Sequence, residues 1–75
     1  MSAAYRRLLE EKYPVGTIIY HGHHTRGEEF CRLEVTGHTN HKIRVRRVLN
    51  GVSFTLTGTV VYTSFDQLVA AQRRY

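Results

Sequence analysis

The sequence predicts a small α+β domain: an antiparallel sheet or SH3-like barrel of four to five strands, with one helix at each end of the chain. Three observations lead to this prediction. Both ends show apolar residues at helical spacing, the middle alternates polar and apolar residues with a period of two, and Asn50-Gly51 is typical of a tight hairpin. Seventy-five residues suffice for one domain, so we treat 1–75 as a single small basic domain in the order α-β-β-β-β-α.

The first helix is expected over residues 2–14. Ser2 can cap it, Pro14 stops it, and Arg6 with Glu10 forms an ion pair at i,i+4 spacing. Its apolar residues fall near one face: Tyr5, Leu8, Leu9 and Tyr13. The last helix is expected over 64–74, because Ser64 and Gln67 have the spacing of a capping box.

Strands are predicted between the helices wherever β-branched, aromatic or alternating residues gather: 15–21, 28–36, 42–49 and 52–57, with 59–63 as a fifth strand or a bulged extension after a bend at Gly58. The intervening segments, a loop at 22–27 and turns at 37–41 and 50–51, are short. Short connections favour an antiparallel meander.

Two assumed registers place the side chains. A two-residue turn at Asn50-Gly51 would pair Leu49 with Val52, and therefore Arg46 with Thr55 and Arg44 with Thr57. A turn at 37–41 would pair Thr36 with Lys42, and therefore Glu34 with Arg44 and Arg32 with Arg46. The resulting core face is Leu33, Val35, Ile43, Val45, Phe54 and Leu56, and the outer face is basic.

Arg47 interrupts the alternation. Strict pleating points it inward beside Cys31 and Phe54, whereas a bulge at Arg46-Arg47 would turn both cations outward, which we expect to cost less than burying a charge.

The excess of positive charge lies in the second half of the chain. The net charge is +5, and residues 1–37 hold five basic and five acidic groups, whereas residues 38–75 hold six basic groups against Asp66 alone. On the assumed registers Arg32 faces Arg46, a like-charge pair that an anion would stabilise. We therefore expect a non-enzymatic module that binds nucleic acid through phosphate contacts. The candidate binding residues are Arg32, Lys42, Arg44, Arg46, Arg47, Thr55, Thr57, Arg73 and Arg74.

Two alternatives stay open. The basic face could bind an acidic surface of a host protein, as an interaction or inhibitor module, or it could simply be the polar side that keeps a sheet soluble and unaggregated.

Catalysis and metal binding find little support in the sequence. Cys31 alternates with apolar residues, which is typical of an inert core thiol, and no catalytic constellation or phosphate-binding glycine loop is present. We assign no cofactor and no metal ligand. His21 and His23 would be the nearest candidates, but they form at most an incomplete ligand set, and the histidines at 38–41 lie beyond a strand length away.

The chain has no apolar stretch long enough to span a membrane and no signal peptide pattern, so we expect a cytoplasmic protein with no membrane partner. A single cysteine excludes an internal disulfide, and so short a chain has a thin core. A homodimer is one way to support it.

The stretch FTLTGTVVYTSFDQLVAA, residues 54–71, has a glycine turn followed by Tyr-x-Ser, a large apolar residue and an alanine-containing helix. The residues that carry this pattern are Gly58, Tyr62, Ser64, Phe65, Leu68, Ala70 and Ala71. The pattern resembles hairpin-then-helix modules of prophage and restriction-modification systems, such as the restriction-adenine-methylase-associated domain. The continuation with Gly and Trp that usually follows is absent. The resemblance implies a DNA-associated module of a phage or mobile element and transfers no binding residues.

Overall fold

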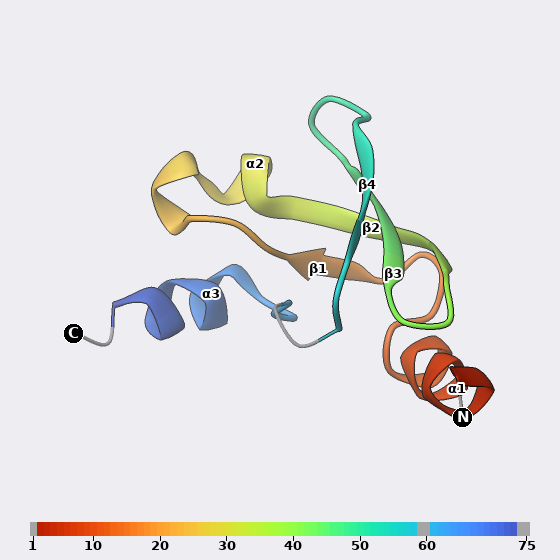
Figure 1. The fold of residues 1–75 in the computed structure, drawn as a ribbon. Helices are drawn as coiled ribbons and strands as arrows, with labels where there is room; N and C mark the ends of the chain where they lie inside the picture. The colour runs from red at the N-terminus through yellow and green to blue at the C-terminus, as the bar shows by residue number, and fades with distance from the viewer. Residues whose placement is uncertain (1, 59–60, 74–75) are drawn as a thin grey trace.

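The computed structural model describes residues 2–58 and 61–73 (Figure 1). Its elements are α1 (Ser2–Lys12), β1 (Ile18–Tyr20), the 3-10 helix η1 (His24–Arg26), α2 (Glu28–Cys31), β2 (Arg32–His38), β3 (Ile43–Arg47), β4 (Ser53–Leu56) and α3 (Phe65–Gln72). This confirms the α+β class with a helix at each end. None of the helices in the described ranges is long and apolar enough to cross a membrane.

The four strands form one open antiparallel sheet in the order β1-β2-β3-β4. Thr59 and Val60 of the predicted fifth strand lie outside the described residues. Tyr62 forms an isolated antiparallel bridge with Tyr20 on the outer edge of β1, with backbone N–H···O distances of 2.7 and 3.0 Å. The sheet is therefore open, with one residue pair added at its β1 edge.

The prediction of a strand over 28–36 is wrong for its first four residues. Residues 28–31 form α2, whose single turn is closed by Cys31 N–H donating to Gly27 O at 3.2 Å. Glu28 and Arg32 form an ion pair at the i,i+4 spacing of a helix. The alternation of Cys31, Leu33 and Val35 cannot distinguish this helical turn from a strand, because Cys31 is the only one of the three residues that lies in the turn.

The β3–β4 hairpin is closed by a loop of four residues, 48–51, rather than by Asn50-Gly51 alone. Arg47 N–H donates to Val52 O at 2.7 Å, and Gly51 adopts a positive φ of 76° while its N–H donates to Arg47 O. The longer loop shifts the pairing by two residues, so that Arg46 lies opposite Ser53 and Arg44 opposite Thr55.

The predicted β2–β3 register is also wrong by two residues, and a bulge follows. Glu34 lies opposite Arg46 and Val35 opposite Val45, but the register then shifts, so that Gly37 meets Arg44 and His38 meets Ile43. Thr36 is the extra residue. The bulge turns His38 toward α1, where its Nε2 lies 2.7 Å from Tyr13 O.

The predicted core face is confirmed, because an even shift keeps each side chain on its own side of a strand. The main core consists of Leu9, Tyr13, Ile19, Leu33, Val35, Ile43, Val45 and Leu56, with Phe54 partly buried against it. Of the four apolar residues expected on one face of the first helix, Leu9 and Tyr13, the latter just past the end of α1, are buried, whereas Tyr5 and Leu8 are exposed.

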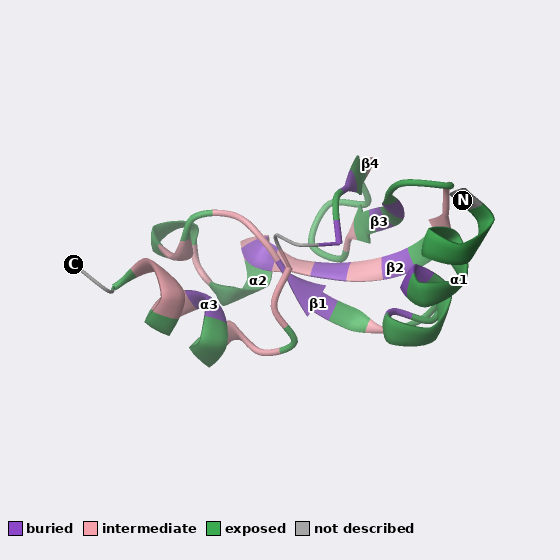
Figure 2. Ribbon diagram, turned by 60° about the horizontal axis from the view of Figure 1, so that its bottom comes forward, coloured by how far each residue is buried: buried purple, intermediate pink, exposed green. Residues whose placement is uncertain are grey.

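A second, smaller core lies under α3 and consists of Tyr20, Cys31 and Leu68, with Tyr62 and Phe65 packed against it. Ile19 belongs to the main core and Tyr20 to this one, so the two clusters use opposite faces of β1. The two terminal helices accordingly stand at opposite ends of the molecule (Figure 2). The predicted cap is confirmed: Ser64 Oγ accepts from Gln67 N–H at 3.1 Å.

Candidate nucleic-acid interface

The outer face of β2, β3 and β4 is polar and solvent-exposed. Arg44 and Arg46 project from β3, with Thr55 and Ser53 opposite them on β4 and Gly37 and Glu34 opposite them on β2. All four side chains contributed by β3 and β4 are exposed. This surface, Glu34, Gly37, Arg44, Arg46, Ser53 and Thr55, is called the outer face below.

Arg44 is an exposed cation of the outer face that has no ion pair with any described residue. A Cβ built on Gly37 would lie 3.3 Å from Arg44 Cδ, so the absence of a side chain at Gly37 lets the arginine stem lie across β2. Within residues 2–58 and 61–73, the Arg44 guanidinium has no ion pair. Its donors are therefore free for a phosphate or carboxylate.

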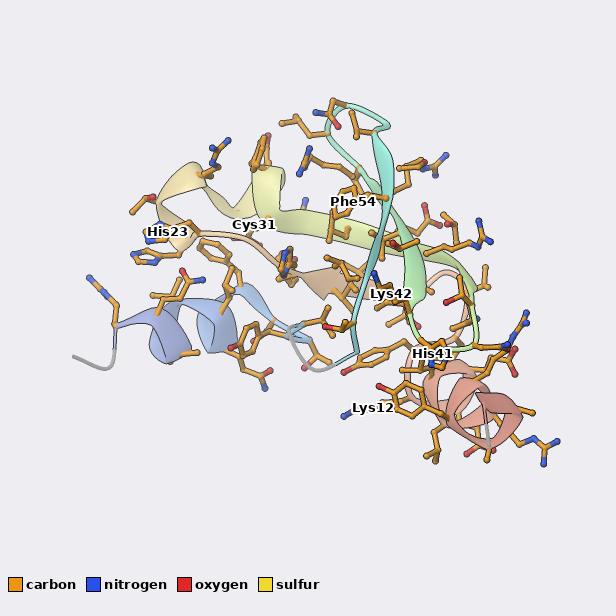
Figure 3. The ribbon with its side chains drawn as sticks, viewed as in Figure 1. Lys12, His23, Cys31, His41, Lys42 and Phe54 are labelled. Carbon is orange, nitrogen blue, oxygen red and sulfur yellow. The ribbon has the colours of Figure 1, made fainter. Side chains whose placement is uncertain are left out.

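Lys42 stands next to this surface in the β2–β3 turn. Its backbone closes the turn, since its N–H donates to Thr39 Oγ1 at 2.8 Å and its carbonyl accepts from Thr39 N–H at 2.8 Å. Its side chain is exposed, and no acidic group of the described chain pairs with it. Figure 3 shows Lys42 beside β3.

Arg46 is neutralised by a neighbour. Its Nη2 donates to Glu34 Oε1 at 2.7 Å across the β2–β3 pair. The expected pairing of Glu34 with Arg44 is therefore wrong: the two-residue shift gives the carboxylate to Arg46 and leaves Arg44 free.

Arg32 does not face Arg46, so the like-charge pair expected from the sequence is absent. Arg32 lies opposite Tyr20 on β1, where its Nε donates to the Tyr20 hydroxyl at 3.2 Å and its Nη2 to Glu28 Oε2 at 3.1 Å. The hydrogen bond and the electrostatic interaction with Tyr20 are the main causes that raise the pKa of Arg32, and Glu28 adds a smaller attraction. The guanidinium is thus already satisfied, and the argument for an anion between Arg32 and Arg46 does not hold.

Arg47 points to the core side of the sheet, and no bulge turns it outward. Its guanidinium lies 4.1 Å from the Phe30 ring centre and 5.3 Å from that of Phe54, and its Nε donates to Phe30 O at 3.0 Å. A half-buried cation between two aromatic rings is stabilised by their negative faces, which replaces the bulge expected from the sequence. Arg47 supports the fold rather than the outer face.

Of the remaining candidate binding residues, some lie on or beside the outer face and some lie away from it. Thr55 lies opposite Arg44 and is exposed, and Thr57 is exposed just beyond β4. Arg73 caps the far end of α3, which stands apart from β3 and β4 in Figures 1 and 2, so it does not extend this surface. Arg74 lies outside the described residues.

Sequence reasoning missed Arg26. Its guanidinium lies 4.9 Å from the Phe30 ring centre, so Phe30 contacts both Arg26 and Arg47. Arg26 ends η1 and Phe30 lies in α2, on either side of the non-helical Gly27, so no helical spacing in the sequence predicts this contact.

The histidines belong to separate parts of the fold. His23 Nδ1 lies 2.6 Å from Thr25 Oγ1 and its ring stacks on that of His24, while Gln72 Oε1 accepts from the His24 N–H at 2.7 Å. His41 lies in the β2–β3 turn, at the other end of β2 (Figure 3). No group of three or more His, Cys, Asp or Glu gathers within the described part of the chain.

Cys31 is fully buried, as expected for a core thiol, and its Sγ lies 3.4 Å from His23 O. Burial raises the pKa of the thiol, and the charges of Arg47 and Arg26 offset part of that rise. The thiol is therefore protected and held in its protonated form.

No protein-family model matches the chain, and no curated protein or solved structure matches it significantly.

Proposed function

We propose that this protein is a non-enzymatic module that binds the phosphate backbone of nucleic acid through its outer face. The observation that carries the proposal is the guanidinium of Arg44, which has no ion pair among the described residues and lies across Gly37 on the exposed outer face of β3. Lys42 adds a second unpaired cation, and Thr55 adds a hydroxyl beside Arg44. An arginine, a lysine and a hydroxyl on one exposed surface are the groups that contact phosphates.

The ligand we expect is a duplex rather than a stacked single strand. The two phenylalanines closest to the basic strand, Phe30 and Phe54, have their rings against Arg47 instead of on the outer face. Without an aromatic platform, affinity rests on phosphates and carries little sequence preference. The resemblance of residues 54–71 to DNA-associated modules of mobile elements favours DNA over RNA.

The test is fluorescence anisotropy with labelled duplex DNA, single-stranded DNA and RNA at about 50 to 200 mM salt. The double variant Lys42→Gln/Arg44→Gln should weaken duplex binding about tenfold or more at the lowest salt and lower the salt slope by about one unit per lost phosphate contact. The matched control is Arg6→Gln/Arg73→Gln, which removes the same charge from α1 and α3. No binding at 50 mM salt, or equal losses in both double variants, would refute the proposal.

The alternative, an acidic surface of a host protein as the partner, is favoured by a different feature. The β3–β4 loop and the residue that follows it expose three apolar side chains, Val48, Leu49 and Val52, each about half accessible. Exposed apolar residues next to cations suit a protein interface better than a phosphate backbone. If nucleic acid does not bind, the protein should be used as bait in a pull-down for an acidic partner. The variant Leu49→Ser should then no longer retain that partner.

A further inference from the structure

Helix α1 exposes apolar surface that the fold leaves uncovered. Leu8 is 61% exposed and Tyr5 38% exposed, although the same helix buries Leu9 in the main core and Tyr13, the residue after the helix, is buried there too. A helix that packs only on its own domain normally turns its large apolar residues to the core. The exposed side of α1 therefore has the composition of a second packing face.

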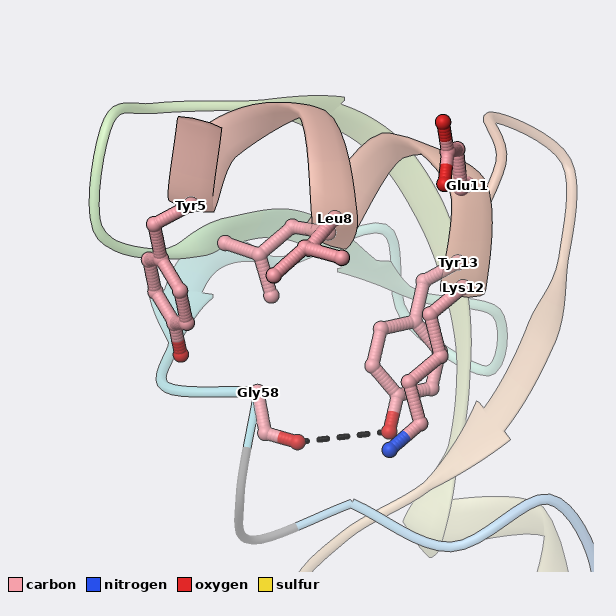
Figure 4. Close-up of a pocket in the computed structure, with 7 residues that line it drawn as sticks. Tyr5, Leu8, Glu11, Lys12, Tyr13 and Gly58 are labelled. Carbon is pink, nitrogen blue, oxygen red and sulfur yellow. Dashed lines mark hydrogen bonds between the residues drawn. The ribbon is translucent and has the colours of Figure 1, made fainter. Parts of the chain in front are cut away.

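The shape of this face is a ridge between two grooves. On one side of Leu8 lies an open cavity of about 450 Å³ whose floor includes Leu9, Tyr13 and Gly58 (Figure 4). The hydroxyl of Tyr13 donates to Gly58 O at 3.2 Å and fixes that floor. On the other side a shallower groove of about 290 Å³ runs between Ala4, Arg7, Leu8 and Glu11. A ridge flanked by grooves is the surface that interlocks with another helix.

The charges on α1 are complementary to the same helix in reverse orientation. Arg6 and Arg7 lie at the middle of the helix, Glu10 and Glu11 follow one turn later, and Lys12 ends it. Arg6 pairs with Glu10 at 3.2 Å, whereas Arg7 and Glu11, at the same spacing, form no ion pair with each other or with any other described residue. A second α1 running antiparallel brings Glu10 and Glu11 of one copy near Arg6 and Arg7 of the other.

We propose that two copies of this chain associate through α1, antiparallel about a two-fold axis. Each Leu8 seats in the groove beside Leu8 of the partner subunit, and each Arg7 faces Glu11 of the partner subunit. A two-fold contact needs only one self-complementary patch, which α1 supplies. The interface also adds apolar burial to a chain whose own core is thin. The proposal is independent of nucleic-acid binding, because Arg44 and Arg46 lie on the other face of the sheet from α1.

The experiment is sedimentation velocity without nucleic acid, across protein concentrations from about 5 to 500 µM. The wild-type protein should shift from monomer to dimer with concentration. Leu8→Ala, which keeps a good helix former at an exposed position, should raise the dissociation constant about 100-fold, because each dimer loses two buried leucine contacts. Circular dichroism of this variant should show the wild-type helix content.

The charge pair gives a second test that does not depend on folding. Arg7→Glu alone and Glu11→Arg alone each place like charges at both contacts and should each weaken the dimer several-fold. An equimolar mixture of the two variants places opposite charges at both contacts and should associate more tightly than either variant alone. Arg73→Glu, with the same charge change on α3, should leave association unchanged. A wild-type monomer at 500 µM, or a mixture that associates no better than its components, would overturn the proposal.

Discussion

Arg46 and Glu34 stand directly opposite each other on β3 and β2, and Arg46 Nη2 lies 2.7 Å from Glu34 Oε1. This ion pair makes the outer face less basic than its composition suggests. Glu34 competes with any phosphate for the guanidinium of Arg46, whereas Arg44, one pleat away on the same face, has no such competitor among the described residues.

Removing this competitor should strengthen nucleic-acid binding. Glu34→Gln keeps the size of the side chain and a hydrogen-bond acceptor but removes its charge, so Arg46 becomes available and one unit of repulsion to phosphate disappears. We expect duplex affinity to rise about threefold to tenfold at 50 mM salt, with a steeper salt slope. Anisotropy titrations at several salt concentrations measure both.

The control for this prediction is Glu10→Gln, which releases Arg6 on α1 from an equally exposed ion pair. Exposed pairs contribute about 0–1 kcal/mol, so both variants should unfold close to the wild type in urea. Equal affinity gains in the two variants would mean that overall charge, and not the outer face, governs binding.

Arg47 and Arg44 should have opposite roles although they lie three residues apart. Arg47→Met loses the hydrogen bond to Phe30 O and the contacts with two aromatic rings, which should lower the free energy of unfolding by about 1–2 kcal/mol. Arg44→Met should leave stability within about 0.5 kcal/mol, because its side chain is exposed.

Binding should follow the reverse order: Arg44→Met weakens it, and Arg47→Met leaves it within about twofold of Arg73→Met, which carries the same charge loss on α3. Urea unfolding and anisotropy on these three proteins test the pattern. Loss of affinity in Arg47→Met at full stability would move Arg47 back to the binding surface.

The buried thiol should make stability depend on alkaline pH. Burial raises the pKa of Cys31 in the folded protein. Below the unfolded pKa of about 8.5 both states keep the proton, and above it the unfolded state loses its proton first. Folded-state stability due to Cys31 is therefore present below that pH and lost as pH rises toward the folded pKa.

Cys31→Ala isolates this effect. At pH 7 the variant should be less stable by about 0.5–3 kcal/mol, because a buried sulfur is removed. The difference should narrow steadily between pH 8 and pH 10. Urea unfolding at each pH, in a reducing buffer, measures the difference, and a constant gap would mean that the thiol ionises equally easily in both states.

The faces of the strands could be predicted from the sequence, and the pairing of the strands could not. Val45 and Leu56 were assigned to the core and Arg44 and Thr55 to the outer face, and each lies there. Alternation is a local property of one strand, and a register error of two residues preserves it. Which acid meets which arginine depends on the register itself, so the expected partners of Glu34 were wrong.

Loop length decided the register. Both Asn50-Gly51 and Val48-Leu49-Asn50-Gly51 can close a hairpin with glycine at a positive φ, and the local sequence favours the shorter loop. The longer loop places Phe54 opposite Val45 and Leu56 opposite Ile43 in the core. In the same way, the bulge at Thr36 brings His38 to the carbonyl of Tyr13, a contact between residues 25 positions apart.

The sequence by itself determined the two terminal helices with four strands between them, the cap at Ser64, the core face of the sheet and the excess of positive charge in the second half of the chain. Each of these follows from neighbours within a few residues or from composition alone. The tertiary structure alone decided that Arg44 is free, that Arg46 and Arg32 are paired, that Arg47 lies between Phe30 and Phe54, and that Leu8 faces outward. These outcomes depend on contacts between distant segments, whose packing selects one register and one helix orientation from several that local preferences leave nearly equal.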